Sequence, residues 1–378
     1  MVKTLFVFGT RPEAIKLCPL VRHLKALTGK YLVHVVVTGQ HRQMLDQVLE
    51  AFQVVPDFDL NLMTPNQTLT SSTSRTLAAL EPVFAEVKPD IAFVQGDTTS
   101  TLCGALAAFY ARVPVGHVEA GLRTGDLAQP FPEEMNRVVT GRLTSIHFAA
   151  TEGSRANLLR EGVDPSSIHV TGNTGIDAVL QVRDRLVSGN LSGGDWNFLN
   201  PQKKLVVVTA HRRESFGPGF ENICGALRRI ADRGDVDVVY PVHRNPNVTG
   251  PVRKHLTGVP GIHLIEPLDY VPFVDLMTKA ALLLTDSGGI QEEGPSLGKP
   301  VIVMREKTER PEAVEAGTVR LAGTDEHRIA GEVFRLLDDA DARAAMSRMH
   351  NPYGDGQASD RIAQATLAFF QRVRCQSA

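Results

Sequence analysis

Residues 5–16 read Leu5-Phe6-Val7-Phe8-Gly9-Thr10-Arg11-Pro12-Glu13-Ala14-Ile15-Lys16. The apolar run 5–8 predicts a short buried strand, and Pro12 is typical of the first turn of a helix. The first backbone N–H groups of a helix have no partner within it, and they carry a partial positive charge. This turn therefore predicts an anion site, to which Arg11 and Lys16 add fixed cations.

The same pattern occurs a second time, far downstream. The apolar run 282–285 leads into Asp286-Ser287-Gly288-Gly289-Ile290-Gln291-Glu292-Glu293. Two strand-to-helix turns of this kind suggest two α/β halves that bind one phosphorylated ligand.

Short apolar runs alternate with helical patterns along the whole chain. Because these runs are continuous rather than alternating, they predict parallel sheets covered by helices on both faces. The fold class that we expect is α/β, with two Rossmann-like, doubly wound domains. The expected strands are 5–8, 32–37, 91–94, 114–118, 146–149, 205–209, 236–242, 262–265, 282–285 and 301–304.

The length of 378 residues favours two domains. We expect an N-terminal domain at 1–172 and a C-terminal, UDP-binding domain at 173–358. The Gly- and Ser-rich stretch 188–195 is typical of a linker or an exposed loop. The last helix, within 359–378, has an apolar face and is expected to pack back on the first domain.

The composition is that of an ordinary globular protein, with 43% hydrophobic and 22% charged residues. A net charge of -2 gives no reason to expect a nucleic acid or an anionic membrane as partner. The four cysteines lie far apart, which argues against a zinc site or a disulfide framework. No signal peptide pattern or run of about 20 apolar residues is present, so we expect a cytoplasmic protein.

Polar and charged residues follow nearly every expected strand. Ligands of open α/β sheets bind outside the carboxyl ends of the strands, so these residues are the candidates for a site. They lie in the segments 9–16, 38–43, 95–99, 117–123, 210–214, 243–245, 286–293 and 305–310.

Seven motifs together resemble the non-hydrolysing UDP-N-acetylglucosamine 2-epimerases, and they occur in order along essentially the whole chain. They are GTRPEAIK at 9–16, QHRQML at 40–45, GDTT at 96–99, HVEAGLR at 117–123, PEEMNR at 132–137, HRRE at 211–214 and DSGGIQEE at 286–293. The resemblance implies a fold similar to the two-domain GT-B glycosyltransferases, an active site in the cleft, and a homodimer. It also implies interconversion of UDP-GlcNAc and UDP-ManNAc, the latter for cell-surface polysaccharides.

Inversion of carbon 2 is difficult because its proton is not next to a carbonyl. Transient oxidation by NAD would favour a G-x-G-x-x-G turn, which the sequence lacks. Elimination of UDP and its re-addition needs a base near carbon 2, cations at the diphosphate and exclusion of water. The family uses this second route, through a bound 2-acetamidoglucal, so we expect neither NAD nor a metal.

The resemblance assigns substrate contacts to seven residues. Arg11 and Lys16 resemble the diphosphate ligands, Ser287 and Gly288 a second phosphate cradle, and Glu293 the ribose ligand. Arg137 and Arg310 are the remaining ligand candidates. A plain N-cap is the alternative for Ser287, and a solvated surface cation is the alternative for Lys16.

Four residues are the candidates for acid–base catalysis: Asp97, Glu119, Glu133 and His211. Asp97 could instead cap the helix that starts at Thr98. Glu119 could be a buried partner of Arg123 or Arg137, and Glu133 could interact only with the helix dipole. The sequence leaves open which carboxylate removes the proton from carbon 2.

Several bacterial members bind a second UDP-GlcNAc that activates the enzyme. The matching positions are Gln40, Gln43, Arg212 and His243. Some activated members have Arg where this chain has Asn66, which removes one phosphate contact.

Three other functions stay open at this point. A hydrolysing epimerase would release ManNAc and UDP, but it usually lacks the continuation PEAIK. A glycosyltransferase would need an acceptor groove, and a UDP-sugar sensor would bind without turnover.

Overall fold

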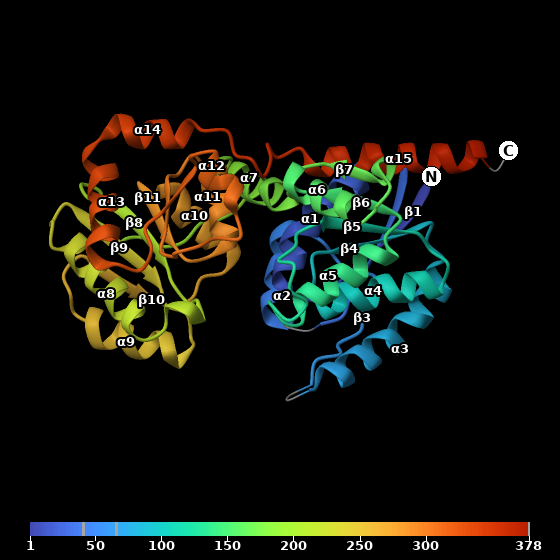
Figure 1. Ribbon diagram of the computed structural model, residues 1–378, viewed down its shortest axis with the longest axis horizontal. Coiled ribbons are helices and arrows are strands. Elements are labelled where there is room, and N and C mark those ends of the chain that lie inside the picture. Colours follow the sequence, from blue (N-terminus) through green and yellow to red (C-terminus); the bar gives the residue numbers. More distant parts are fainter. Residues whose placement is uncertain (40–41, 65–66, 377–378) are drawn as a thin grey trace. The chain divides into compact units, whose positions relative to one another are not determined.

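The computed structural model describes residues 1–39, 42–64 and 67–376. It forms two compact units. Unit 1 comprises Met1–Ala178 and Tyr353–Ala378, and unit 2 comprises Val179–Pro352. The chain thus passes between the units after Ala178 and after Pro352, whereas we expected the domain boundaries after residues 172 and 358. The connecting helix α7 (Thr174–Val187) spans the first of these positions (Figure 1).

Unit 1 is built on a seven-stranded parallel sheet with the order β3-β2-β1-β4-β5-β6-β7. In its centre Phe6 stacks on Phe93, with the ring centroids 4.8 Å apart. The strands are β1 (Val2–Phe8), β2 (Tyr31–Val37), β3 (Phe58–Asp59), β4 (Ile91–Gln95), β5 (Val115–Ala120), β6 (Ile146–Ala149) and β7 (Ile168–Val170).

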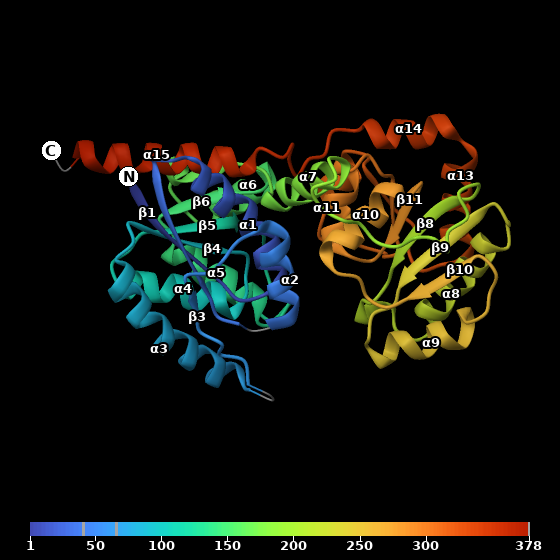
Figure 2. The same cartoon turned by 180° about the vertical axis from the view of Figure 1, so that it is seen from behind.

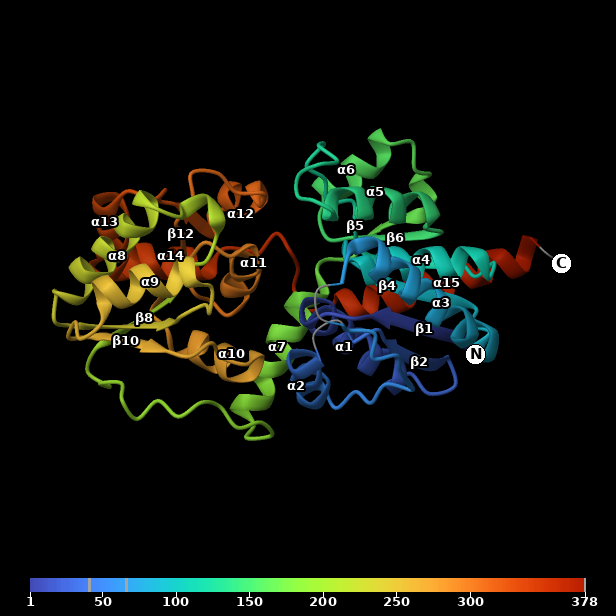
Figure 3. The same ribbon diagram turned by 90° about the horizontal axis from the view of Figure 1, so that it is seen from below.

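Helices cover both faces of this sheet (Figure 3). One layer contains α3, α4 and α5, packed side by side, and α1 packs with α2 and α15. The helices are α1 (Arg11–Ala26), α2 (Arg42–Phe52), α3 (Leu69–Val87), α4 (Thr99–Tyr110), α5 (Glu133–Leu143), α6 (Glu152–Arg160) and α15 (Ala358–Gln376).

Unit 2 repeats this plan with six parallel strands in the order β10-β9-β8-β11-β12-β13. Strands β8 to β11 of this sheet are labelled in Figure 2. The strands are β8 (Lys204–Thr209), β9 (Val236–Pro241), β10 (Ile262–Ile265), β11 (Leu282–Thr285), β12 (Val301–Val303) and β13 (Val319–Leu321). The helices are α8 (Pro218–Ala231), α9 (Pro246–Leu256), α10 (Tyr270–Lys279), α11 (Gly288–Ser296), α12 (Pro311–Glu315), α13 (Glu326–Asp338) and α14 (Ala340–Arg348).

The predicted fold class, two doubly wound parallel sheets, is confirmed. All ten predicted strands form, with ends that differ by at most a few residues. Three strands were missed: β3, β7 and β13. Each has only two or three residues and lies at the edge of its sheet, so none shows the buried apolar run on which the prediction relied.

The C-terminal helix α15 packs within unit 1. The Tyr31 hydroxyl donates to the carbonyl oxygen of Ala363 at 2.6 Å. The buried Asp177 carboxylate accepts the backbone N–H groups of Ala358 and Ser359 at 3.2 and 2.8 Å. These bonds satisfy helix N–H groups that have no partner within the helix, and they fix where α15 begins.

Within the described residues, the helices are too short or too polar to cross a bilayer.

Candidate active site

Glu119 lies at the end of β5 in an uncommon backbone conformation, with φ at +64°. The pairing between β5 and β6 shifts register between Val118 and Ala120, so the strand bulges at this residue. Such a bulge redirects a side chain. The Glu119 carboxylate accepts from Lys16 Nζ at 2.6 Å and from the side-chain amide of Gln95.

This geometry gives Lys16 a partner that the sequence did not indicate. Lys16 is an expected diphosphate ligand, and in the structure it forms an ion pair with an expected catalytic carboxylate. Arg123, one proposed partner of Glu119, pairs with Glu161 at 2.6 Å.

Asp97 follows β4 and pairs with Arg137, with Nη2 at 2.5 Å from Oδ2. Its predicted alternative, capping of α4, is wrong, because Thr98 is the N-cap and accepts the backbone N–H of Thr101 at 3.1 Å. Burial raises the pKa of Asp97. The cations Arg137 and Lys16 oppose this rise, whereas the negative charge of Glu119 adds to it. A carboxyl with a raised pKa suits proton transfer near neutral pH.

Asp97 and Glu133 line the same pocket of unit 1, with a volume of about 410 Å³. The N-termini of α3 and α4 also border it. The lining residues are Thr10, Met63, Gln67, Thr68, Leu69, Ser72, Asp97, Thr98, Thr99, Pro132, Glu133 and Asn136. The structure thus brings two of the four acid–base candidates to one cavity.

Glu133 is half-buried, whereas its neighbour Glu134 is fully buried. The Glu134 carboxylate accepts the backbone N–H groups of Thr124 and Gly125, both at 3.0 Å, and lies 3.4 Å from Arg137. Sequence reasoning missed Glu134, since the pair Glu133-Glu134 does not show which side chain faces inward. Glu134 fixes the loop before α5 and so helps to place Glu133.

Just before α1, a side chain of the protein binds backbone N–H groups beside the expected anion site. The Glu13 carboxylate accepts the backbone N–H groups of Gly9 and Thr10 at 3.0 and 2.7 Å. It also accepts the hydroxyl of Thr98 at 2.7 Å. Any anion bound here must therefore rely on Arg11 and Lys16 rather than on these N–H groups. The capping-box spacing from Thr10 to Glu13 could have indicated this.

The second turn, at the start of α11, differs. Ser287 is the N-cap residue, as its alternative predicted, although its side chain makes no capping hydrogen bond. A Cβ atom placed on Gly288 would lie 3.6 Å from Arg310 Nη2 and 3.5 Å from Glu309 Oε1. The Thr285 hydroxyl accepts the N–H of the N-cap residue Ser287 at 2.9 Å. Within the described residues, no side chain accepts the N–H groups of residues 288–290. This helix N-terminus therefore offers backbone N–H groups and a nearby guanidinium to an anion.

Arg310 is held in place by Glu292, whose carboxylate accepts from Arg310 Nε. Burial opposes ionisation of Glu309, but Arg305, Arg310 and Arg212 keep its pKa below the usual value. Glu293, the expected ribose ligand, is half-buried on α11.

His211 follows β8 and contacts the fully buried Asp286, with Nδ1 at 3.2 Å from Oδ1. Its ring stacks on His243, with the centroids 5.4 Å apart. Arg212 lies 3.6 Å from Glu309. The structure thus brings together two of the four activator candidates, His243 and Arg212, around His211. Gln40, Asn66 and the side chain of Gln43 lie outside the described residues.

In the described parts of the chain, no group of three or more His, Cys, Asp and Glu residues is arranged to hold a metal ion.

Comparisons with known proteins agree with one another. A family model described as UDP-N-acetylglucosamine 2-epimerase matches residues 25–367. The chain is 60% identical to the UDP-N-acetylglucosamine 2-epimerase of Escherichia coli K12, over 96% of this chain and 98% of that one.

Two solved structures are also similar. The UDP-GlcNAc 2-epimerase of Neisseria meningitidis, bound to UDP-GlcNAc, has 45% identity and a TM-score of 0.88, over 97% of this chain and 100% of that one. The enzyme of Methanocaldococcus jannaschii, in complex with UDP-GlcNAc and UDP, has 34% identity and a TM-score of 0.78, over 97% and 99%.

Proposed function

Since the chain belongs to the UDP-N-acetylglucosamine 2-epimerase family, we propose that it inverts carbon 2 by eliminating UDP and adding it back. A base removes the proton from carbon 2, and the electron pair of that C–H bond forms a double bond between carbons 1 and 2. The bond from carbon 1 to the phosphate oxygen breaks, and its electron pair leaves with UDP. A proton then returns to the opposite face of the bound 2-acetamidoglucal, and UDP re-adds at carbon 1.

The observation that carries this proposal is the cavity of unit 1, where Asp97 and Glu133 meet. Two carboxyl groups at one cavity can serve as the base on one face of the sugar and the acid on the other. Glu119, paired with Lys16, is the third group in this proton transfer. Burial raises the pKa of Asp97, which favours its protonated form as proton donor.

We assign binding of the nucleotide to unit 2. The open N-terminus of α11, with Gly288 beside Arg310, offers an anion site for the diphosphate. Glu293, one to two turns into α11, is the proposed ribose ligand. His211 completes the acid–base set from this unit. The UDP-ManNAc formed would supply the synthesis of surface polysaccharides.

The test is proton NMR of the purified protein with UDP-GlcNAc in D2O, without NAD or metal. We expect UDP-ManNAc to appear and the proton on carbon 2 to exchange for deuterium. Accumulation of free ManNAc and UDP would show a hydrolysing enzyme. Binding without any change in the sugar would favour a transferase or a sensor.

The proposed reaction uses no cofactor, since the cations Arg11, Lys16 and Arg310 can neutralise the diphosphate. We expect full activity in EDTA. Loss of activity that added Mg²⁺ restores would contradict this part of the proposal.

A second UDP-GlcNAc is the proposed activator, with Arg212 and His243 among its contacts. The prediction is a sigmoidal dependence of rate on UDP-GlcNAc, together with acceleration of the reverse reaction by trace UDP-GlcNAc. Hyperbolic kinetics in both directions would remove the activator site.

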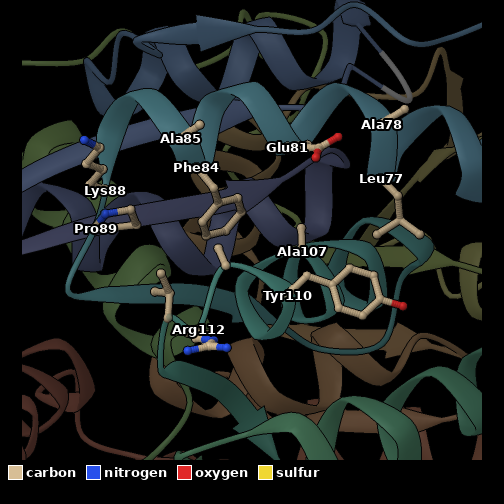
Figure 4. A pocket seen from close by; sticks show the side chains of 12 residues that line it. Leu77, Ala78, Glu81, Phe84, Ala85, Lys88, Pro89, Ala107, Tyr110 and Arg112 are labelled. Carbon is tan, nitrogen blue, oxygen red and sulfur yellow. The ribbon is translucent and has the colours of Figure 1, made fainter.

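We also propose that the chain forms a homodimer through the groove between α3 and α4 (Figure 4). Two-fold interfaces need a surface that is complementary to itself. This groove of about 710 Å³ has an apolar floor that includes Phe84. Its rim carries Glu81 together with Lys88 and Arg112, so two copies can pair opposite charges. At the end of α4, Tyr110 is 71% exposed and can insert into a second groove.

Sedimentation of Tyr110→Asp tests this interface. We expect a monomer, whereas Val55→Asp, at an exposed position elsewhere in unit 1, should remain a dimer. A dimer that survives Tyr110→Asp would exclude this groove.

A further inference from the structure

Asp286 is the most deeply buried charged group beside an acid–base candidate. Its side chain has no exposed surface. It follows β11 and immediately precedes the N-cap of α11, yet its carboxylate turns away from that helix. Oδ2 accepts the backbone N–H groups of His211 and Arg212 at 2.6 and 2.7 Å.

The second oxygen of Asp286 faces the His211 ring. Oδ1 is buried without a hydrogen-bond partner in the structure and lies 3.2 Å from Nδ1, so a small turn of the ring would let Nδ1–H donate to it. A carboxylate can only accept, so this hydrogen bond requires a proton on Nδ1. In a neutral ring the other nitrogen, Nε2, then has no proton and can accept one.

The other groups near His211 carry no charge or have their charge balanced, so Asp286 is the charge that acts on the His211 ring. The ring of His243 stacks on that of His211. Burial and His211 lower the pKa of His243 although Asp286 opposes this, and a lowered pKa favours the neutral ring. The Tyr240 hydroxyl donates to the carbonyl oxygen of Ala210 at 2.6 Å and carries no charge, since burial raises its pKa. The Arg212 guanidinium lies 3.6 Å from Glu309, which balances its charge.

We propose that Asp286 is a positioning residue for catalysis: it holds His211 with the proton on Nδ1 and leaves Nε2 to exchange a proton with the substrate. When Nε2 takes up that proton, the Asp286 carboxylate stabilises the resulting cation. This arrangement is the one by which a buried aspartate orients a catalytic histidine in hydrolases. The proposal rests on the proposed function of His211 in the epimerisation.

The first test needs no variant. Nitrogen-15 NMR of the free protein, labelled on histidine, reports which ring nitrogen carries the proton. We expect the Nδ1–H tautomer for His211 in its neutral form. The Nε2–H tautomer would overturn the proposal, whatever any variant does.

The second test is Asp286→Asn, measured by the same NMR titration and by kinetics. We expect a lower pKa of His211, and a fall in kcat of roughly 100-fold or more, since general acid–base groups contribute at least that much. KM should change little, because the nucleotide contacts stay in place.

A matched control is Asp275→Asn. Asp275 is also buried in unit 2 and accepts a backbone N–H, from Gly194 at 2.9 Å, but lies on α10. We expect it to leave kcat and the His211 titration unchanged. An unchanged His211 pKa in Asp286→Asn would overturn the proposal.

Failure of the proposed function would look different. The tautomer and the pKa shift would be as expected, but His211→Gln would keep full turnover. In that case His211 is not catalytic, and the positioning proposal is overturned with it.

Discussion

In each unit a buried carboxylate connects the loops after two neighbouring central strands, but the two carboxylates bind different groups. In unit 1 Glu13, after β1, reaches Thr98 at the start of α4, after β4. In unit 2 Asp286, after β11, reaches back to the backbone of His211, after β8. β1 and β4 occupy the same places in their sheet as β8 and β11, where the strand order reverses. Ligands of doubly wound sheets bind at that point.

The difference lies in what each carboxylate does to its own helix. Glu13 also binds the N–H groups of Gly9 and Thr10, the two residues that precede α1. Asp286 turns away from α11 and leaves that helix N-terminus open beside Arg310. Two turns with the same strand-to-helix pattern are therefore built differently: a carboxylate binds the N–H groups that precede the first helix, whereas the second helix starts with Gly288 beside Arg310, as the proposed diphosphate site requires.

The largest expected effect is that of Asp97→Asn. If unit 1 carries out proton transfer, kcat should fall by about 1000-fold, within the range for general acid–base groups, with KM nearly unchanged. Steady-state kinetics with UDP-GlcNAc measures both. Glu86→Gln, at an exposed position on α3, is the control and should behave as wild type. Near-normal turnover of Asp97→Asn would remove Asp97 from the catalytic set.

The second largest expected effect is the loss of stability when Glu13, which connects two loops of unit 1, is replaced. Glu13→Ala leaves the buried N–H of Gly9 without a partner, which should lower the free energy of unfolding by about 3 kcal/mol. Urea unfolding of unit 1, followed by hydrogen exchange at Gly9 and Thr10, measures it. If exchange at both amides stays as slow as in wild type, Glu13 does not hold this turn.

Replacement of a glycine by alanine in each turn tests whether that turn binds an anion or stabilises the fold. Gly288→Ala is tolerated sterically, because the added Cβ meets ordinary contacts at 3.5 Å or more. Its methyl group would, however, crowd a bound phosphate, so we expect KM to rise about tenfold, or about 1.4 kcal/mol, with kcat unchanged. Gly331→Ala, which meets nothing within 4 Å, is the control.

The corresponding change in unit 1 should act on the fold instead. A Cβ atom on Gly9 would lie 1.9 Å from Thr38 Oγ1 and 2.6 Å from Ser100 Oγ. Gly9→Ala should therefore lower stability. A pure KM effect in Gly9→Ala, or a pure stability effect in Gly288→Ala, would reverse the roles assigned to the two turns.

The sequence was sufficient for the central strands and for the residues that gather after them. Runs such as 282–285 are buried on both faces, and their apolar character shows it. Asp97 and Glu133 follow different elements, yet they share a cavity because the carboxyl ends of parallel strands lie at one edge.

The partners of the charged residues could not be predicted, because they depend on the direction of side chains from distant segments. Lys16 and Glu119 are 103 residues apart, and they meet where β5 bulges at Glu119. No local pattern indicates that Asp286 turns away from its own helix.

The smallest expected effect is the pH dependence of the Glu13 contribution. Burial raises the pKa of Glu13, although its hydrogen bonds with Thr98, Gly9 and Thr10 oppose the rise. A carboxyl whose pKa is higher in the folded than in the unfolded state stabilises the fold when it is protonated. This contribution is complete at pH values below the ordinary pKa of about 4.3. That contribution is lost as the pH rises through the folded-state value. We therefore expect wild type to lose stability relative to Glu13→Gln as the pH rises from about 4.3 through the folded-state pKa, by about 1.4 kcal/mol for each unit of the raised pKa. Urea unfolding of both proteins across this range measures the difference. If the difference in free energy of unfolding between the two proteins does not change with pH, Glu13 keeps its ordinary pKa in the folded protein.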